Sequence, residues 1–260
     1  MAQSLEAPEL SPSPSATPAK PWSFLSSSKY QFSLHTATDE NKQSSLESTL
    51  EADYSASPRL RVQGVVGITQ ALQPALDFRV FNPQFRGYWL LNPTENKLKF
   101  YVGPTMTLPF GSDAKDESLI VGAGLGGRAV LKLNDASGVG FKAYYDLTVN
   151  KNFHQFDTSI TGDVNNQYAL NHTIYLEYYF HPQWNLNATT SFSSLWNYLG
   201  LISNTYTLEQ ELDFQATDLV MLFFSHTRGG DFLGPDGQSY SFGIFDPDAS
   251  RFALGMYLSF

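Results

Sequence analysis

Residues 119–133 read LIVGAGLGGRAVLKL and alternate between two kinds of side chain. Leu125, Leu131 and Leu133 share one face, whereas Arg128 and Lys132 fall on the opposite face among glycines. Successive side chains of a β-strand point to opposite sides, so this period of two predicts a strand with one apolar face. The stretch is longer than the roughly five or six residues usual in soluble sheets. It is long enough for a tilted strand that crosses a bilayer, which needs about 9–11 residues.

The same alternation continues over most of the chain in both directions from this stretch. It covers the segments 22–34, 46–54, 59–68, 97–102, 139–149, 168–180, 186–198, 203–214, 217–226 and 251–260. With a strand around 76–90 we expect about twelve strands, within a range of roughly ten to fourteen. The segment 76–90 is the least regular, because Asn82-Pro83 interrupts it and proline lacks the N–H that a central ladder needs. Either a β-bulge or a short excursion of the chain before residue 88 would explain this interruption.

The composition agrees with a barrel in a membrane. Charged residues make up 16% of the chain, against roughly a quarter in soluble domains, and aromatic residues make up 15%. Mean hydropathy is −0.24, and no run of apolar residues approaches the ~18–20 of a membrane helix. Only every second residue of a barrel strand meets lipid, so low charge and modest hydropathy coexist there. The net charge of −9 argues against nucleic-acid binding.

The first segment of the chain differs from the rest. Residues 1–21 contain five prolines spaced among serine, alanine and threonine, and no pattern in them could bury a face. We expect a flexible periplasmic tail, acting as a plain linker or as a tether to the cell wall or a periplasmic partner. Residues 22–260 would then form the barrel as one domain.

The lengths of the connections give an independent indication. The links at 55–58, 92–96, 134–138, 181–184 and 215–216 are short and rich in proline, asparagine, glycine or serine. The intervening links include 109–118, 150–166 and 227–249, which are longer. Transmembrane barrels alternate short periplasmic turns with longer external loops. The pattern therefore places both ends of the barrel domain on the periplasmic side.

The closing residues 251–260, RFALGMYLSF, place Phe252, Leu254, Met256, Leu258 and Phe260 on one face, with an aromatic residue last. In this stretch the chain resembles the bacterial outer-membrane β-barrel proteins, in a porin-like form whose subfamily is not identified. The resemblance implies an all-β fold, a single transmembrane antiparallel up-and-down barrel in the bacterial cell outer membrane. It also implies that these five residues are the signal read by the barrel-assembly machinery. Lipid and lipopolysaccharide would surround the barrel.

A soluble β-sandwich is the alternative that alternation alone allows. The strand lengths, the order of short and long links and the aromatic residues near predicted strand ends all argue against it.

With the apolar face outward, charged residues point into the lumen. We define a basic wall and an acidic wall, which the closed cylinder would set against each other. The basic wall comprises Arg59, Arg61, Arg79, Lys97, Lys99, Arg128, Lys132 and Lys142. The acidic wall comprises Glu47, Glu51, Asp53, Glu209, Glu211 and Asp213. These charges either pair and fill the interior or create a transverse field that orients polar solutes.

Two further segments bear on the interior. Residues 185–193 present small uncharged polar groups inward, either as a wall of a sugar- or water-accessible path or as room for bulky partners such as Arg61 or Tyr144. Residues 219–224 are apolar on both faces. An inserted loop or an oligomer contact would cover the second face.

No catalytic constellation can be assembled. Ser225 and His226 are adjacent and point to opposite faces of a strand, so they cannot form a nucleophile and base pair. No metal-ligand spacing is present, and we expect no cofactor. The sequence favours a passive, porin-like channel for small polar solutes and no enzyme. The main alternative is a non-conducting structural barrel, homo-oligomeric in one version, that organises lipid or partners; a lipid-modifying enzyme of the outer membrane is a second alternative.

Overall fold

The computed structural model describes residues 21–34, 42–73, 75–92, 97–134, 139–233 and 240–260. Residues 1–20 of the tail predicted at 1–21 and most of the links at 92–96 and 134–138 lie outside the described residues. The strands are β1 (Trp22–Ser33), β2 (Ser44–Ser57), β3 (Leu60–Gln73), β4 (Asp77–Val80), β5 (Gln84–Leu90), β6 (Leu98–Thr107), β7 (Leu119–Asn134), β8 (Gly140–His154), β9 (Asn166–His181), β10 (Trp184–Asn197), β11 (Ile202–Gln215), β12 (Val220–Asp231) and β13 (Ser250–Ser259). One short helix, α1 (Ser112–Glu117), precedes β7 in the described part of the chain.

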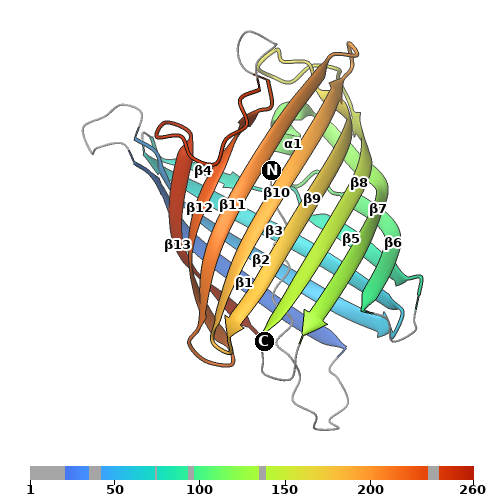
Figure 1. Ribbon diagram of the computed structural model, residues 1–260. Coiled ribbons are helices and arrows are strands. Elements are labelled where there is room, and N and C mark those ends of the chain that lie inside the picture. Colours follow the sequence, from blue (N-terminus) through green and yellow to red (C-terminus); the bar gives the residue numbers. More distant parts are fainter. Residues whose placement is uncertain (1–20, 35–41, 74, 93–96, 135–138, 234–239) are drawn as a thin grey trace.

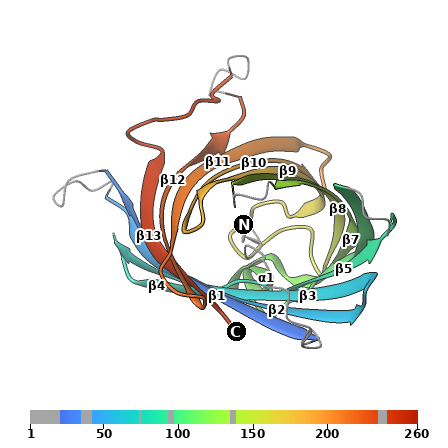
Figure 2. The same ribbon diagram turned by 60° about the horizontal axis from the view of Figure 1, so that its bottom comes forward.

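The strands form one closed antiparallel sheet (Figures 1 and 2). Neighbours in sequence pair with one another, except that β4 and β5 both pair with β3, and β1 pairs with both β2 and β13. The last residue takes part in this closure, because the backbone N–H of Phe260 donates to the carbonyl of Phe24 at 3.0 Å. A closed sheet pairs the backbone groups of neighbouring strands with one another, which a bilayer core requires. The predicted all-β barrel is confirmed.

The irregular segment at 76–90 divides into two short strands. β4 pairs with residues 68–71 of β3, and β5 pairs with residues 60–65 of the same strand. They occupy one position in the sheet, so the described chain forms a barrel of twelve strand positions. Between them the N–H of Phe81 still donates to the carbonyl of Gly67 at 2.8 Å, and its ring fills the space that Gly67 leaves. The interruption predicted from Asn82-Pro83 is a local irregularity within one strand position.

Apolar and polar residues divide between the outer and inner faces as the alternation predicts. Leu50, Phe100, Leu186 and other large apolar side chains are exposed on the outside. The most deeply buried side chains are mostly polar: Gln63, Glu177, Asp213, Ser225 and Ser250. Among the described residues, no helix is long and apolar enough to cross a membrane.

Short and long links lie at opposite ends of the barrel (Figure 1). The described short links join β2 to β3, β9 to β10 and β11 to β12, at the end where Phe260 also lies. Long links at the other end carry α1, the segment 155–165 and the approach to β13. We call these the turn end and the loop end.

The second apolar face of residues 219–224 is covered from inside the barrel. Met221 and Phe223 pack with Leu25 and Tyr257 in a small hydrophobic cluster. The ring of Phe223 occupies the space above Gly255, where an added Cβ would lie 2.4 Å from it. Neither of the covers expected from the sequence, an inserted loop or a second copy, is needed, because neighbouring strands supply the partners.

Candidate functional site

A polar cavity of about 380 Å³ lies inside the barrel. Its charged lining residues are Lys29, Glu47, Arg86, Arg128, Asp146 and Glu209. Most of the remaining lining consists of threonine, serine, asparagine and tyrosine side chains, drawn from β1, β2 and β5 to β12. These residues occupy inward positions because the pleat sends every second side chain to the lumen.

Several of the cavity's charges pair with acids or bases on the adjacent strand. The pairing of β7 with β8 sets Arg128 opposite Asp146. The guanidinium donates to both carboxylate oxygens, at 2.6 Å from Nε and 2.5 Å from Nη2. It also lies over the ring of Tyr88, 4.6 Å from its centroid. Lys29 and Glu47 form a looser pair between β1 and β2, with Nζ and Oε2 3.6 Å apart.

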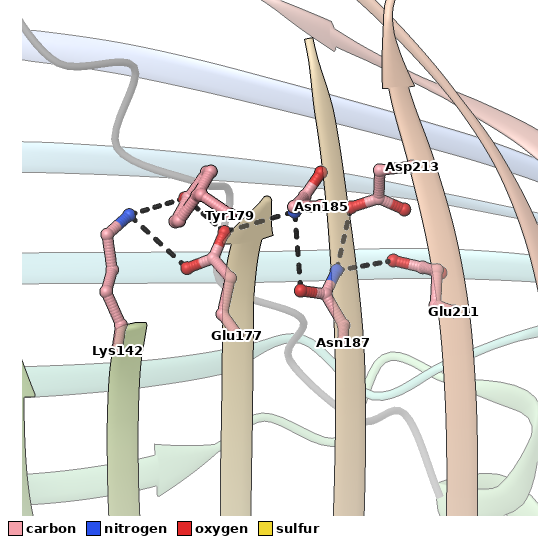
Figure 3. Close-up of polar contacts among 7 residues, drawn as sticks. All are labelled: Lys142, Glu177, Tyr179, Asn185, Asn187, Glu211 and Asp213. Carbon is pink, nitrogen blue, oxygen red and sulfur yellow. Dashed lines mark hydrogen bonds and ion pairs between the residues drawn. The ribbon is translucent and has the colours of Figure 1, made fainter. Parts of the chain in front are cut away.

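A buried polar network lies nearer the turn end, across β8 to β11 (Figure 3). Lys142 donates to the hydroxyl of Tyr179 at 2.6 Å and lies 3.3 Å from Glu177 Oε2. Tyr179 in turn donates to Glu177. Asn185 Nδ2 donates to Glu177 Oε1 at 3.2 Å and to Asp213 Oδ2 at 3.0 Å, which joins the basic and acidic ends of the network.

Asn187 continues the network toward β11. Its Nδ2 donates to Asp213 Oδ2 at 2.7 Å and to Glu211 Oε1 at 3.4 Å. On the other side of Glu211, the hydroxyl of Tyr257 donates to both carboxylate oxygens, at 3.1 and 3.2 Å. The small uncharged residues that were predicted to face inward on β10 therefore include two amides, Asn185 and Asn187, that bridge acids.

The members of the predicted basic wall lie in three places: at the turn end, at the loop end and on strands within the barrel. Arg59 and Lys97 are exposed in links at the turn end, and Arg79 lies at the loop end. Arg79 contacts Asp77 at 2.8 Å and Asp113 of α1 at 3.2 Å. The other predicted bases, which lie on strands within the barrel, are Arg61, Lys99, Arg128, Lys132 and Lys142.

Members of the two predicted walls also meet as close neighbours. Arg61 donates to Asp53 from Nε at 2.8 Å and from Nη2 at 2.5 Å, so this base and acid pair directly between β3 and β2. At the next inward position of the same two strands, Gln63 donates to Glu51 at 2.7 Å. Glu209, Glu211 and Asp213 follow one another on the lumen side of β11. Along β2 and β3, opposite charges in the lumen therefore neutralise one another between adjacent strands.

Two bases that line the cavity, Lys29 and Arg86, escaped the sequence reasoning. Lys29 alternates with Tyr30 and Phe32, so its inward direction could have been found from the same period of two. Arg86 follows the interruption at 81–83, where β4 and β5 meet their partner in different registers. Because the register changes at this break, the alternation before it does not predict whether Arg86 faces inward or outward.

One acid at the loop end has an altered environment. Glu117, the last residue of α1, is partly buried and lies near Asp113 and Asp116. Burial first, and then repulsion from these two acids, raises the pKa of its carboxyl above the usual range. His154 Nε2 is 3.9 Å from Glu117 Oε2. This pair lies at the mouth of the barrel, away from the cavity.

The chain is thus a closed antiparallel β-barrel of twelve strand positions with an apolar outer face and a polar lumen, the arrangement that transmembrane β-barrels have. No family model and no curated protein matches the sequence. Solved structures do match. The COG4313 outer membrane channel from Pseudomonas putida F1 is 13% identical with a TM-score of 0.58, covering 92% of this chain and 95% of that one.

Two solved porin structures are also similar to this chain. The NanC porin is 9% identical with a TM-score of 0.56, covering 90% of this chain and 98% of that one. The KdgM porin in complex with disordered oligogalacturonate is 8% identical with a TM-score of 0.53, covering 92% and 99%. At these identities the likeness shows the shared fold and leaves the solute to be argued from this chain's own residues.

Proposed function

We propose that this protein is a passive channel for small polar solutes in the bacterial outer membrane. The observation that carries the proposal is the cavity inside the barrel, lined by hydroxyl, amide and charged side chains. Such groups replace part of a polar solute's hydration shell as it passes. In the part of the chain that the structure describes, no group of His, Cys, Asp and Glu residues is arranged to hold a metal ion.

The cavity has room for small solutes. Its volume is about 380 Å³, which is many times the share of liquid volume of one water molecule, roughly 30 Å³. Ions and small uncharged or zwitterionic molecules fit this space. The network joining Lys142, Glu177, Asn185, Asn187 and Asp213 lies toward the turn end and is not part of the cavity lining.

The same network favours the rival function, a barrel that does not conduct. Glu177 and Asp213 are 1% and 0% exposed, so their side chains are packed as in a sealed interior. A structural barrel of that kind would organise lipid or partners, as a monomer or as a homo-oligomer. The two functions predict different electrical behaviour, so conductance decides between them.

The test is conductance of the purified protein in a planar bilayer. We expect discrete, ohmic openings from the wild type. The double variant Asn185→Ala/Asn187→Ala should conduct more, because it removes two side chains from the buried polar network that lies toward the turn end. Thr190→Ala, an outward-facing change on the same strand, serves as the matched control and should leave conductance unchanged. A silent bilayer from protein that is folded in detergent would refute the channel and leave the structural barrel.

We also propose that β13 guides assembly. Leu254 and Met256 on its outer face are exposed, and so is Phe260, which follows the strand. This exposure suits both contact with lipid and recognition by the barrel-assembly machinery before the sheet closes.

A further inference from the structure

The outer face of β12 is apolar toward the turn end and polar toward the loop end. Its outward positions are Val220, Leu222 and Phe224, followed by His226 and Arg228. Leu222 and Phe224 are exposed on the outside of the barrel, as suits contact with lipid. A charged side chain on the lipid-facing surface of a barrel is destabilising. Direct contact with lipid is therefore favourable on β12 only as far as Phe224.

Residues 240–249, which lead into β13, lie over the polar part of this face. We call them the cover segment. Figure 2 shows this segment, drawn in red before β13, outside the ring of strands. The carbonyl of Ser241 accepts hydrogen bonds from Arg228 Nη2 and from the hydroxyl of Tyr206, both at 3.0 Å. Asp246 Oδ2 lies 3.5 Å from the same Nη2. The side chain of Arg228 is only 11% exposed as a result, and its charge has an acidic partner.

Further contacts hold the cover segment against the barrel. The ring of Phe242 packs on the rings of Tyr206 and Phe192, with centroids 4.9 and 6.3 Å away. The backbone N–H of Ser250 donates to the carbonyl of Asp246 at 2.7 Å. The N–H of Asp246 donates in return to the hydroxyl of Ser250 at 3.0 Å. The segment is therefore fixed to β10, β11 and β13 as well as to Arg228 of β12.

The side of the cover segment that faces away from the barrel is apolar. Its large exposed residues are Tyr240, Phe242, Ile244 and Phe245, which are between 46% and 73% exposed. Exposed apolar patches rimmed by polar groups mark surfaces that contact a membrane or another protein. The cover segment thus buries the polar groups of β12 and presents apolar side chains in their place.

This apolar patch is continuous with the outer face of the barrel. The ring of His226 lies between those of Phe245 and Phe252, with centroids 5.9 and 5.0 Å away. Phe252 in turn stacks on Phe224 at 5.8 Å. The patch therefore extends the surface that meets lipid and does not form a separate apolar area. This continuity favours lipid as the partner of the patch.

The backbone of the cover segment limits how deep it can lie. Residues 241–249 form neither helix nor strand. An irregular backbone exposed to lipid is not tolerated in the hydrocarbon core, because its polar groups would lack partners there. Aromatic side chains favour the boundary between headgroups and acyl chains, where barrels carry their aromatic girdles. The segment suits that boundary.

We propose that the cover segment is a membrane-contacting surface, which places Tyr240, Ile244 and Phe245 among outer-leaflet lipids at the boundary between headgroups and acyl chains. This interaction goes beyond the proposed channel function and holds whether or not the lumen conducts. The segment extends the lipid-facing surface over the part of β12 where the strand's own side chains are polar.

The test is the depth of a fluorescent label in phosphatidylcholine vesicles. The chain contains no cysteine, so Ile244→Cys and Tyr240→Cys each provide one labelling site in the full-length protein. The matched control is Ile160→Cys, at an exposed apolar residue in the link between β8 and β9 at the same end of the barrel. The backbone N–H of Ile160 donates to Asp116 of the link that carries α1, so this position is held away from the cover segment.

We expect lipids brominated near the headgroup end of their acyl chains to quench the labels at 244 and 240 severalfold more than the label at 160. Iodide in the water should quench them severalfold less. Labels at 244 and 240 that behave like the control overturn the proposal. Labels shielded from both quenchers indicate that a second copy of the chain covers the patch, and they also overturn it. Heat-dependent migration in gel electrophoresis reports that each variant is folded.

Discussion

Replacing Phe223 by alanine tests whether the inner face of β12 is packed like a protein core. The side chain is 4% exposed and contacts the ring of Tyr257, with centroids 4.6 Å apart. Gly255 provides the space that the ring fills. The neighbouring backbones are held by the pairing of β12 with β13, so they cannot close in on the vacated volume.

The expected cost follows from this lack of relaxation. Truncating a buried phenylalanine to alanine usually destabilises a protein by about 3–5 kcal/mol, as lost transfer energy plus the cost of the cavity. Phe223 also borders the lumen cavity, so water can enter the gap, and we expect a value near the lower end, about 3 kcal/mol.

The matched control is Phe224→Ala on the outer face of the same strand. Phe224 is 43% exposed on the apolar outer face, where lipid chains can fill the gap, so only a transfer term of at most about 1.5–3 kcal/mol remains. The free energy of unfolding of both variants is measured by reversible denaturant titration in lipid vesicles. Equal losses in the two variants, or a smaller loss for Phe223→Ala, would show that the inner cluster is not a packed core.

Two further changes test assembly and strand packing. Phe260→Asp should leave the protein largely in the periplasm, because it places a charge in the final strand's apolar face; cell fractionation measures this, and normal insertion contradicts the assembly role. Gly103→Ala should cost about 1–3 kcal/mol through overpacking, since its Cβ would lie 2.0 Å from the carbonyl oxygen of Gly87 on β5. Gly127→Ala, whose nearest contact would be 4.0 Å, should be near neutral in the same unfolding assay, and equal effects would refute the close approach of the two strands.

The strands, their faces and their order could be predicted because each depends on local pattern. Residues 119–133 alternate so regularly that the lumen directions of Arg128 and Lys132 follow from parity alone. The interruption at Asn82-Pro83 also follows from one residue's missing N–H. The alternation of short and long links identifies the two ends of the barrel without any knowledge of pairing. The basic and acidic walls were predicted as the lumen's charged lining, and their role in conduction stays a prediction.

Only the tertiary structure decided which side chains meet. The partners of Arg61 and Lys142 and the cluster around Phe223 all depend on register between strands. Register and closure are set by pairing between segments far apart in sequence, and a shift of one residue would turn each side chain to the other face. The chain's own period therefore fixes what faces inward, whereas the closed sheet alone fixes which inward groups contact one another.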